Sequence, residues 1–380
     1  MREIDFGTIM TLVKGKKPRQ LFKEAQEGAL PYVDIKAFEL NEVQNYTDGV
    51  KCVPCDENDV LIVCDGSRSG LVGKGIKGYV GSTLAKVSAE GIIRDYLYYF
   101  LQSKYRVFNT HKKGTGTPHL NQELLKSQKI IILPIQQQQK IVSRIEELFS
   151  KLDKGVETLQ TIKQQLAVYR QAVLTEAFEG IENTVELGSI ASIVDPHPSH
   201  RTPVEVIGGV PYIGVGDIDY VHHVIDFSSA RKVSNDILQD HLSRYTLHDG
   251  DFIMGKIGTI GKPFIIALPQ NYTLSANVIL IKPNKKVVIP KYLFWQVSSS
   301  QITKQLLEGS TSTTQPAFGI KKARLLSIKI CSLEEQNRIV QKIESHLSLC
   351  DDIGQSVTAA LSQAEAMRQS ILKQAFEGTL

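Results

Sequence analysis

Two stretches of the chain place apolar residues at alternating spacings of four and three positions. The first lies within residues 136–181 and the second within residues 333–380, and neither contains proline. A glycine that could end a helix, Gly180 or Gly378, stands near the end of each stretch. This heptad pattern predicts two long helices, each of which needs a partner helix along its length.

The residues at the heptad positions are expected to form the seam between paired helices. They are Ile141, Ile145, Leu148, Leu152, Leu159, Ile162 and Leu166 in the first helix and Ile339, Ile343, Ile353, Val357 and Ile371 in the second. The same register places Tyr169 and Met367 on the seam. The simplest partner for each helix is the other one, and helices separated by a globular domain most easily pack antiparallel. The alternative is that each helix packs only on its own domain, as an ordinary amphipathic helix does.

The segments before the helices, residues 1–135 and 182–332, have a different pattern. Short aliphatic runs bounded by Gly, Pro, Asn and Asp predict buried strands at residues 60–63, 130–133 and 278–281. Shorter helical stretches follow some of these runs. We therefore expect an α+β domain in front of each long helix.

The chain contains an internal repeat. The Ala-Phe-Glu-Gly sequence that ends at Gly180 recurs 198 residues later, ending at Gly378, and the same offset holds through both long helices. The match continues upstream with smaller offsets, pairing Pro31-Tyr32 with Pro211-Tyr212. The fold class expected is thus α+β, as a tandem duplication of a domain followed by a long helix.

Composition narrows the class of protein. The chain has 380 residues, with 44 Lys and Arg against 40 Asp and Glu, so any basic surface must be local. No apolar run approaches the roughly 20 residues of a membrane span, and no signal peptide is recognisable. Five cysteines in a chain of this length fit reduced thiols and a cytoplasmic location.

Most candidate chemistry fails on spacing. The glycine-rich segment 66–78 does not place Gly-Lys-Ser/Thr at the head of a helix, as a phosphate-binding loop would. It is either a glycine-turned hairpin or a loop that approaches DNA phosphates. Cys52 and Cys55 have redox or half-zinc spacing, but no second pair accompanies them, so structural thiols are favoured. The histidines show no metal-ligand spacing, and we expect no metal site and no cofactor bound by this chain.

Cations and hydroxyl-bearing loops cluster in the two front segments. Backbone amides, hydroxyls and lysines are the groups that contact phosphates, so together these residues favour nucleic acid. Each cation alone could equally be part of an ordinary solvated surface. The candidate DNA contacts are Lys14, Lys16, Lys17, Arg19, Arg68, Lys74, Lys77, Lys112, Lys113, Thr115, Thr117, Arg201, Lys256, Lys262, Thr311, Thr313, Lys321 and Lys322.

Several segments resemble the DNA-specificity subunits of type I restriction–modification complexes. Residues 332–340, Ser-Leu-Glu-Glu-Gln-Asn-Arg-Ile-Val, are similar to the sequence with which the family begins its long helix. Residues 133–142 are a degraded copy of it, and the stretches at 250–253, 290–293 and 309–316 also fit. The resemblance covers the whole chain.

The resemblance implies two target-recognition domains, residues 1–135 and 182–332, joined by an antiparallel coiled coil. Each domain would read one half of a bipartite target in double-stranded DNA, and the helices would set the gap between the halves. Such a subunit has no catalytic activity. It recruits modification subunits, expected to be two, which bind S-adenosylmethionine and methylate adenine. Restriction subunits that translocate and cleave DNA join them, so ATP and Mg²⁺ are also expected on partner subunits.

Two other classes of function compete with this interpretation. A coiled-coil scaffold would not bind DNA, whereas phosphate contacts make affinity fall steeply with salt. An enzyme would need the glycine-rich loops or the pair Cys52 and Cys55, with a bound nucleotide or metal.

Overall fold

The computed structural model describes residues 2–40, 42–114, 116, 118–199, 201–220, 222–308 and 317–378. The chain forms two compact units, residues 1–160 with 358–380 and residues 161–357. Each unit combines one front segment with parts of both long helices.

The first unit contains short strands and helices followed by a long helix. Its elements are β1 (Arg2–Asp5), β2 (Met10–Lys14), β3 (Leu30–Val33), α1 (Ile35–Leu40), β4 (Tyr46–Thr47), β5 (Pro54–Cys55), β6 (Val60–Val63), β7 (Val72–Lys74), β8 (Gly78–Val80), β9 (Leu84–Ala89), α2 (Arg94–Ser103), α3 (Tyr105–Thr110), α4 (Gln122–Lys126), β10 (Lys129–Ile132) and the start of α5 (Ile135–Ala177). An antiparallel sheet has the order β2-β9-β6-β7, and a second sheet, β4-β3-β8-β5, contains the parallel pair β3–β8. Strand β1 pairs with β10 just before α5 begins.

The second unit repeats this plan. Its elements are β11 (Thr184–Glu186), α6 (Leu187–Ile190), β12 (Ala191–Val194), β13 (Val210–Ile213), β14 (Ile218–Asp219), β15 (Val224–Ile225), β16 (Lys232–Val233), α7 (Asn235–Arg244), β17 (Phe252–Gly255), β18 (Pro263–Ile265), β19 (Thr273–Leu274), β20 (Val278–Pro283), α8 (Pro290–Val297), α9 (Ser300–Leu307), α10 (Ile320–Arg324), β21 (Ser327–Lys329) and α11 (Leu333–Glu377). The sheet β12-β20-β17-β18 corresponds to β2-β9-β6-β7, and the parallel pair β13–β19 corresponds to β3–β8. The duplication seen in the sequence is therefore a duplication of architecture.

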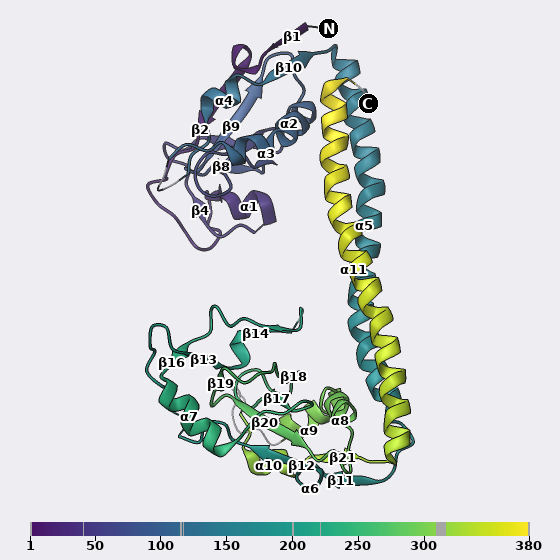
Figure 1. The fold of residues 1–380 in the computed structure, drawn as a ribbon. Coiled ribbons are helices and arrows are strands. Elements are labelled where there is room, and N and C mark those ends of the chain that lie inside the picture. Colours follow the sequence, from purple (N-terminus) through teal and green to yellow (C-terminus); the bar gives the residue numbers. More distant parts are fainter. Residues whose placement is uncertain are drawn as a thin grey trace. The chain divides into compact units, whose positions relative to one another are not determined.

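The long helices run antiparallel within each unit (Figure 1). In the first unit, the beginning of α5 lies beside the end of α11, and Arg368 of α11 pairs with Asp153 and stacks 4.4 Å from the ring of Phe149. In the second unit the end of α5 lies beside the beginning of α11, where Lys342 Nζ is 2.9 Å from Glu176 Oε1. The antiparallel pairing predicted from the heptads is confirmed.

The helices also belong to the cores of the front domains. In the first unit Ile145 of α5 and Leu372 of α11 are fully buried in one cluster with the strands and α2. The ring of Phe376 stands edge-on to Tyr96 at 5.0 Å. The end of α11 thus packs on the first domain, which contradicts the alternative that each helix packs only on its own domain.

The seam is wider and less regular than the heptads indicate. Ile145, Ile339, Ile343 and Val357 are buried, and Ile141, Leu148, Leu152, Leu159, Ile162, Leu166 and Ile371 are half-buried. Ile353, at 37%, and Met367, at 49%, are exposed, so their placement on the seam was wrong. Tyr169 is 43% exposed but reaches the partner helix, where its Oη is 2.9 Å from Nδ1 of His346. The buried line of α11 also includes Leu347, Cys350, Ala364, Leu372 and Ala375, of which Cys350 and Ala364 are heptad positions. The positions Ile343, Cys350, Val357 and Ala364, spaced seven residues apart, all stay buried along this line.

Helix ends and membrane character complete the description. Gly180 and Gly378 both adopt positive φ, at +73° and +78°, as glycines after a helix commonly do. No helix in the described ranges is long and apolar enough to cross a membrane.

Candidate nucleic-acid interface

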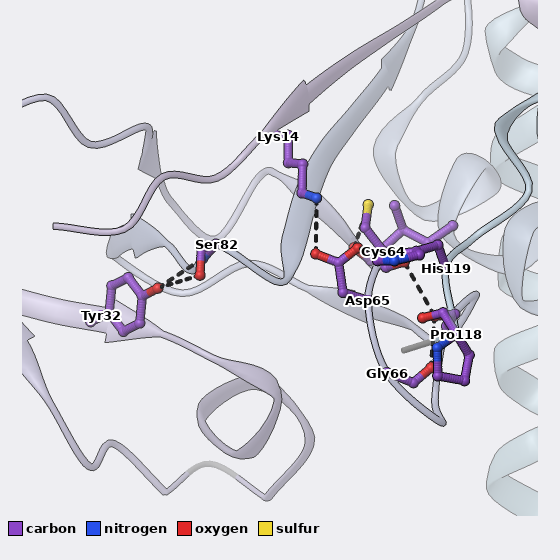
Figure 2. A network of polar contacts seen from close by, with 10 residues as sticks. Lys14, Tyr32, Cys64, Asp65, Gly66, Ser82, Pro118 and His119 are labelled. Atoms are coloured by element: carbon purple, nitrogen blue, oxygen red, sulfur yellow. Dashed lines mark hydrogen bonds and ion pairs between the residues drawn. The ribbon is translucent and has the colours of Figure 1, made fainter. Parts of the chain in front are cut away.

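A polar network joins three loops of the first domain at one end of its antiparallel sheet. Lys14, the last residue of β2, places Nζ 2.8 Å from Asp65 Oδ2, just beyond β6. The other carboxylate oxygen of Asp65 is 2.8 Å from Nδ1 of His119. Figure 2 shows these side chains converging from separate parts of the sequence. Burial raises the pKa of Asp65, but hydrogen bonds from Lys14 and His119 outweigh it and hold that pKa below its ordinary value.

The glycine- and threonine-containing loop that precedes His119 is anchored to the β6–β7 turn. Gly66 N–H donates to the Pro118 carbonyl at 2.8 Å, and Ser69 Oγ donates to Gly66 O at 2.8 Å. Lys112 Nζ donates to Ser67 O at 2.8 Å from the other side of the loop. The segment 66–78 is thus the turn and second strand of a hairpin, with its turn clamped to the neighbouring loop.

The residues that follow the two polar loop sequences, Leu120 and Phe318, occupy corresponding places in the two domains. Leu120 N–H donates to Cys64 O at 2.8 Å in the first domain, and Phe318 N–H donates to Lys256 O at 3.1 Å in the second. Ala317 also forms a bridge to Ile257. Ala317 and Phe318 therefore lie at the end of β17 just as His119 and Leu120 lie at the end of β6. The candidates Thr115, Thr117, Thr311 and Thr313 lie outside the described residues.

An ion pair ties the same two strands together in both domains, but with its charges exchanged. In the first domain the lysine is Lys14, the last residue of β2, and the acid is Asp65, which lies just after β6. In the second the acid follows β12 and the lysine follows β17, as Asp195 and Lys256, with 2.8 Å between Nζ and Oδ2. Lys256 is only 4% exposed. Its assignment as a surface DNA contact was therefore wrong, because its ammonium group is buried in this pair.

A tyrosine fixes the loop after the parallel strand pair in both domains. Tyr32 Oη accepts the Ser82 backbone N–H at 2.8 Å, as Figure 2 shows, and Tyr212 Oη accepts the Ala276 N–H at 3.0 Å. Cys64 N–H donates to Thr83 O at 2.8 Å, and Lys256 N–H donates to Asn277 O at 2.9 Å. The two domains therefore share one backbone frame, on which Ser82 and Thr83 are replaced by Ala276 and Asn277.

The remaining candidate cations divide into distinct groups. We use "loop cluster" for the polar groups at the ends of β6 and β17 and in the loops beside them. In the first domain this cluster includes Lys14, Arg68, Lys112 and Lys113. Arg68 pairs with Glu39, and Lys113 lies 2.6 Å from Glu123. Lys74 lies elsewhere, because it is opposite Val60 at the other end of β6, 2.9 Å from Asp95. Lys322 Nζ donates to Leu306 O at 2.7 Å, next to the start of loop 309–316. The rest are all exposed to solvent, as Lys14, Arg68, Lys74 and Lys113 are: Lys16, Lys17, Arg19, Lys77, Arg201, Lys262 and Lys321.

Of the cysteines and histidines considered from the sequence, Cys55, His197 and His241 lie inside the domains. No group of His, Cys, Asp and Glu side chains in the described part of the chain could hold a metal ion. Cys55 is buried and donates to Ile76 O at 3.2 Å, and burial raises the pKa of its thiol to about 11. His197 packs against His241, with 2.9 Å between ring nitrogens, inside the second domain. Burial and repulsion from His197 lower the pKa of His241 to about 4.

The neutral polar groups near the ends of β6 and β17 were not predicted from the sequence. Tyr32, Tyr212 and Asn277 carry no charge, so a search for phosphate contacts passes over them. The repeat offered a signal, since Tyr32 and Tyr212 are paired by it. The partnership of Asp65 with His119 has no such signal, because the two residues are 54 positions apart.

Comparison with known proteins identifies the relatives of this chain. The family model described as the type I restriction modification DNA specificity domain matches twice, at residues 3–167 and 182–363. The MjaVIII type I restriction enzyme specificity subunit of Methanocaldococcus jannaschii is 25% identical over 371 residues, covering 90% of this chain and 85% of that protein. The EcoBI specificity subunit of Escherichia coli is 23% identical over 351 residues, covering 85% and 73%.

Solved structures share the fold. One chain, from a study of complex assembly and conformational transition in the type I R-M system, has a TM-score of 0.73 at 16% identity. It covers all of this chain and 98% of its own. The HsdS subunit from Thermoanaerobacter tengcongensis has a TM-score of 0.54 at 15% identity, with coverage of 100% and 97%. With the family model matched once on each repeat, the chain belongs to the type I restriction–modification DNA specificity family.

Proposed function

We propose that each front domain reads one half of a bipartite target in double-stranded DNA. The observation that carries this proposal is the double match of the family model, once on each copy of a duplicated domain. The loop clusters support it. They lie at equivalent places on a shared backbone frame but present different side chains, as readers of two different half-sites would.

Two kinds of contact follow from the chemistry of the clusters. Cations such as the exposed Lys16 and the half-buried Lys112 would bind phosphates and set the position of the duplex without reading its sequence. Side chains on the frame, such as Asp65 and Asn277, would face the base edges. In this proposal the phosphate contacts govern affinity, and the base contacts govern sequence specificity.

We further propose that the antiparallel helices set the spacer between half-sites and dock the modification subunits. The repeated pairing of domain and helices offers two equivalent docking places, which fits two modification subunits. In this proposal the chain performs no catalysis of its own. S-adenosylmethionine, ATP and Mg²⁺ would act on the modification and restriction subunits.

Mapping methylated adenines in DNA from cells that express this chain with its modification subunit tests the main proposal. A bipartite motif is the expected result. Binding of the complex to target DNA should also weaken steeply with salt, with log affinity falling linearly against log salt. A scaffold without DNA contacts would give neither the motif nor the salt dependence.

Lengthening both helices by one heptad tests the spacer. Seven residues inserted after Gln160 and seven after Val357 add about 10 Å of helix and keep the seam in register. The spacer of the methylated motif should grow by about three base pairs, at roughly 3.4 Å per pair. A matched variant with the insertion only after Gln160 breaks the pairing register and should lose methylation. An unchanged spacer in the double insertion would refute the ruler.

A further inference from the structure

The second domain has a polar cleft of about 320 Å³ beside its parallel strand pair. It lies beside the end of β17, because Ile257, which follows β17 and bridges to Ala317, is part of its wall. The polar side chains that line it are those of Thr202, Tyr212, Asp217, Arg231, Ser275 and Asn277.

The orientation of the Asn277 amide is fixed by its surroundings. Its Oδ1 accepts the Val215 backbone N–H at 3.3 Å and also the hydroxyl of Ser275. Among the described residues no hydrogen-bond partner is seen for its Nδ2, which leaves an amide donor at the cleft wall. The amide occupies space that Gly214 leaves open, since a Cβ at Gly214 would lie 2.7 Å from Oδ1 and 3.0 Å from Nδ2.

Two further donors border the same cleft. The hydroxyl of Tyr212 already accepts the Ala276 N–H, so its own hydrogen remains available to a ligand. The Arg231 guanidinium donates Nη1 to Pro203 O at 3.3 Å and leaves 43% of its side chain exposed. The nearest carboxylate to Arg231, on Glu205, is 4.0 Å away. Arg231 is therefore held in place while other guanidinium N–H groups stay accessible.

The charge of the cleft favours a base over a phosphate. Asp217 lines it, with its carboxylate held by the Gly214 N–H at 2.8 Å. A carboxylate repels the phosphate backbone, whereas it does not repel the neutral edge of a base. Donors from Asn277 and Arg231 call for a base with neighbouring acceptors, and guanine presents two, N7 and O6, in the major groove.

The first domain does not reproduce this set of groups. Thr83 occupies the frame position of Asn277, and Asp34 pairs with Gly214 through the repeat. A hydroxyl thus replaces the amide donor, and the glycine is replaced by Asp34, whose carboxylate accepts the Ala37 N–H at 3.0 Å. The difference in chemistry at one frame position predicts a difference in the base that is read.

We propose that this cleft reads a guanine of the second half-site and that Asn277 and Arg231 are specificity-determining residues. This inference rests on the proposed function, because it assigns a base contact within the half-site that the second domain reads. It goes further by naming the base and the side chains.

The test is to map methylation motifs for the full chain with its modification subunit, comparing wild type with Asn277→Asp and Asn277→Ala. The aspartate variant keeps the shape and the acceptors for Val215 and Ser275 but removes the donor. Thr83→Ala, at the same frame position of the first domain, is the matched control. Preference for guanine at one position of one half-site should fall by about 5- to 150-fold in both Asn277 variants. The other half-site should stay intact, which also shows that the variants fold.

Several results would overturn the inference. These are a wild-type motif without guanine in the affected half-site, an unchanged motif in both Asn277 variants, and a uniform loss of methylation across sequences with neither half-site altered. Loss of the same guanine preference in Thr83→Ala would also count against it. Absence of any bipartite motif in the wild type is a different result, since it would overturn the proposed function and this inference with it.

Discussion

Replacing Gln336 by leucine should loosen the attachment of α8 to the base of α11. Gln336 is fully buried, and its Oε1 accepts the N–H of Ile289, the N-cap of α8, at 2.8 Å. Its Nε2 donates to Cys331 O at 2.9 Å and to Val287 O at 3.2 Å. Val287 is 42% exposed, so water can replace that bond. Two groups remain unpaired, on Ile289 and Cys331. Both residues are half-buried, so each group should cost about 1–2 kcal/mol, and the second unit should lose about 2–4 kcal/mol of unfolding free energy.

Trp295 makes the assay specific, because it is the single tryptophan of the chain and lies in α8. Its fluorescence during urea unfolding should show a midpoint lowered by roughly 1 M in Gln336→Leu. Gln341→Leu makes the same chemical change at an exposed site on the same helix and should stay within about 0.5 kcal/mol of wild type. Gln138→Leu breaks the equivalent contacts in the first unit and should move this transition much less. A shift in Gln336→Leu no larger than that of Gln341→Leu would refute the reasoning.

Three further predictions concern charge and thiols. Lys16→Ala should weaken DNA binding for all sequences alike and lower the slope of log affinity against log salt by about 1. Lys154→Ala, on the exposed side of α5, should leave both the affinity and the slope unchanged. A loss of binding confined to one DNA sequence would argue against a phosphate contact. His241 has a pKa lowered to about 4 in the folded protein, against about 6.5 when unfolded. Its contribution to the unfolding free energy is therefore constant above about pH 6.5. As the pH falls from about 6.5 towards 4, the second unit should lose about 1.4 kcal/mol of unfolding free energy per pH unit. Urea unfolding followed by tryptophan fluorescence should show a weaker dependence of unfolding free energy on pH for His241→Gln than for wild type. The same pH dependence in both proteins would contradict the lowered pKa of His241. Cys52→Ser with Cys55→Ser should leave salt-dependent DNA binding intact, because the thiol of Cys55 is buried and its pKa is raised to about 11; abolished function would favour a thiol-dependent activity.

The periodic parts of the fold were predictable from the sequence, and the polar parts were not. Heptads and the repeat led to two helices and two α+β domains, since burial of a helix face leaves a regular signature. The exposure of Ile353 was missed because the contact line of α11 is shifted by one residue at some heptad positions, where Leu347 is buried beside the half-buried His346. Sequence periodicity defines a helix face only to within such a shift.

Buried polar residues show the limit most clearly. Residues 136–139 are four consecutive glutamines, yet only Gln138 is buried, where its amide bonds Ile93 N–H, Gly91 O and Leu133 O. Composition cannot distinguish it from its neighbours, although the repeat aligns it with Gln336. Lys256 was misjudged for a related reason, because nothing local in the sequence shows that Asp195 lies beside it.

The exchanged ion pairs limit how segments of this chain can be recombined. A chimaera that moved β12 with Asp195 into the first domain would set two carboxylates, Asp195 and Asp65, against each other. The reciprocal exchange would bring Lys14 against Lys256 in a buried place, where an unpaired ammonium is strongly destabilising. A functional chimaera must therefore take the end of β2 and the end of β6 from the same domain. New DNA specificities would arise in this architecture by exchanging whole domains, since grafting single strands between the copies would break the pair.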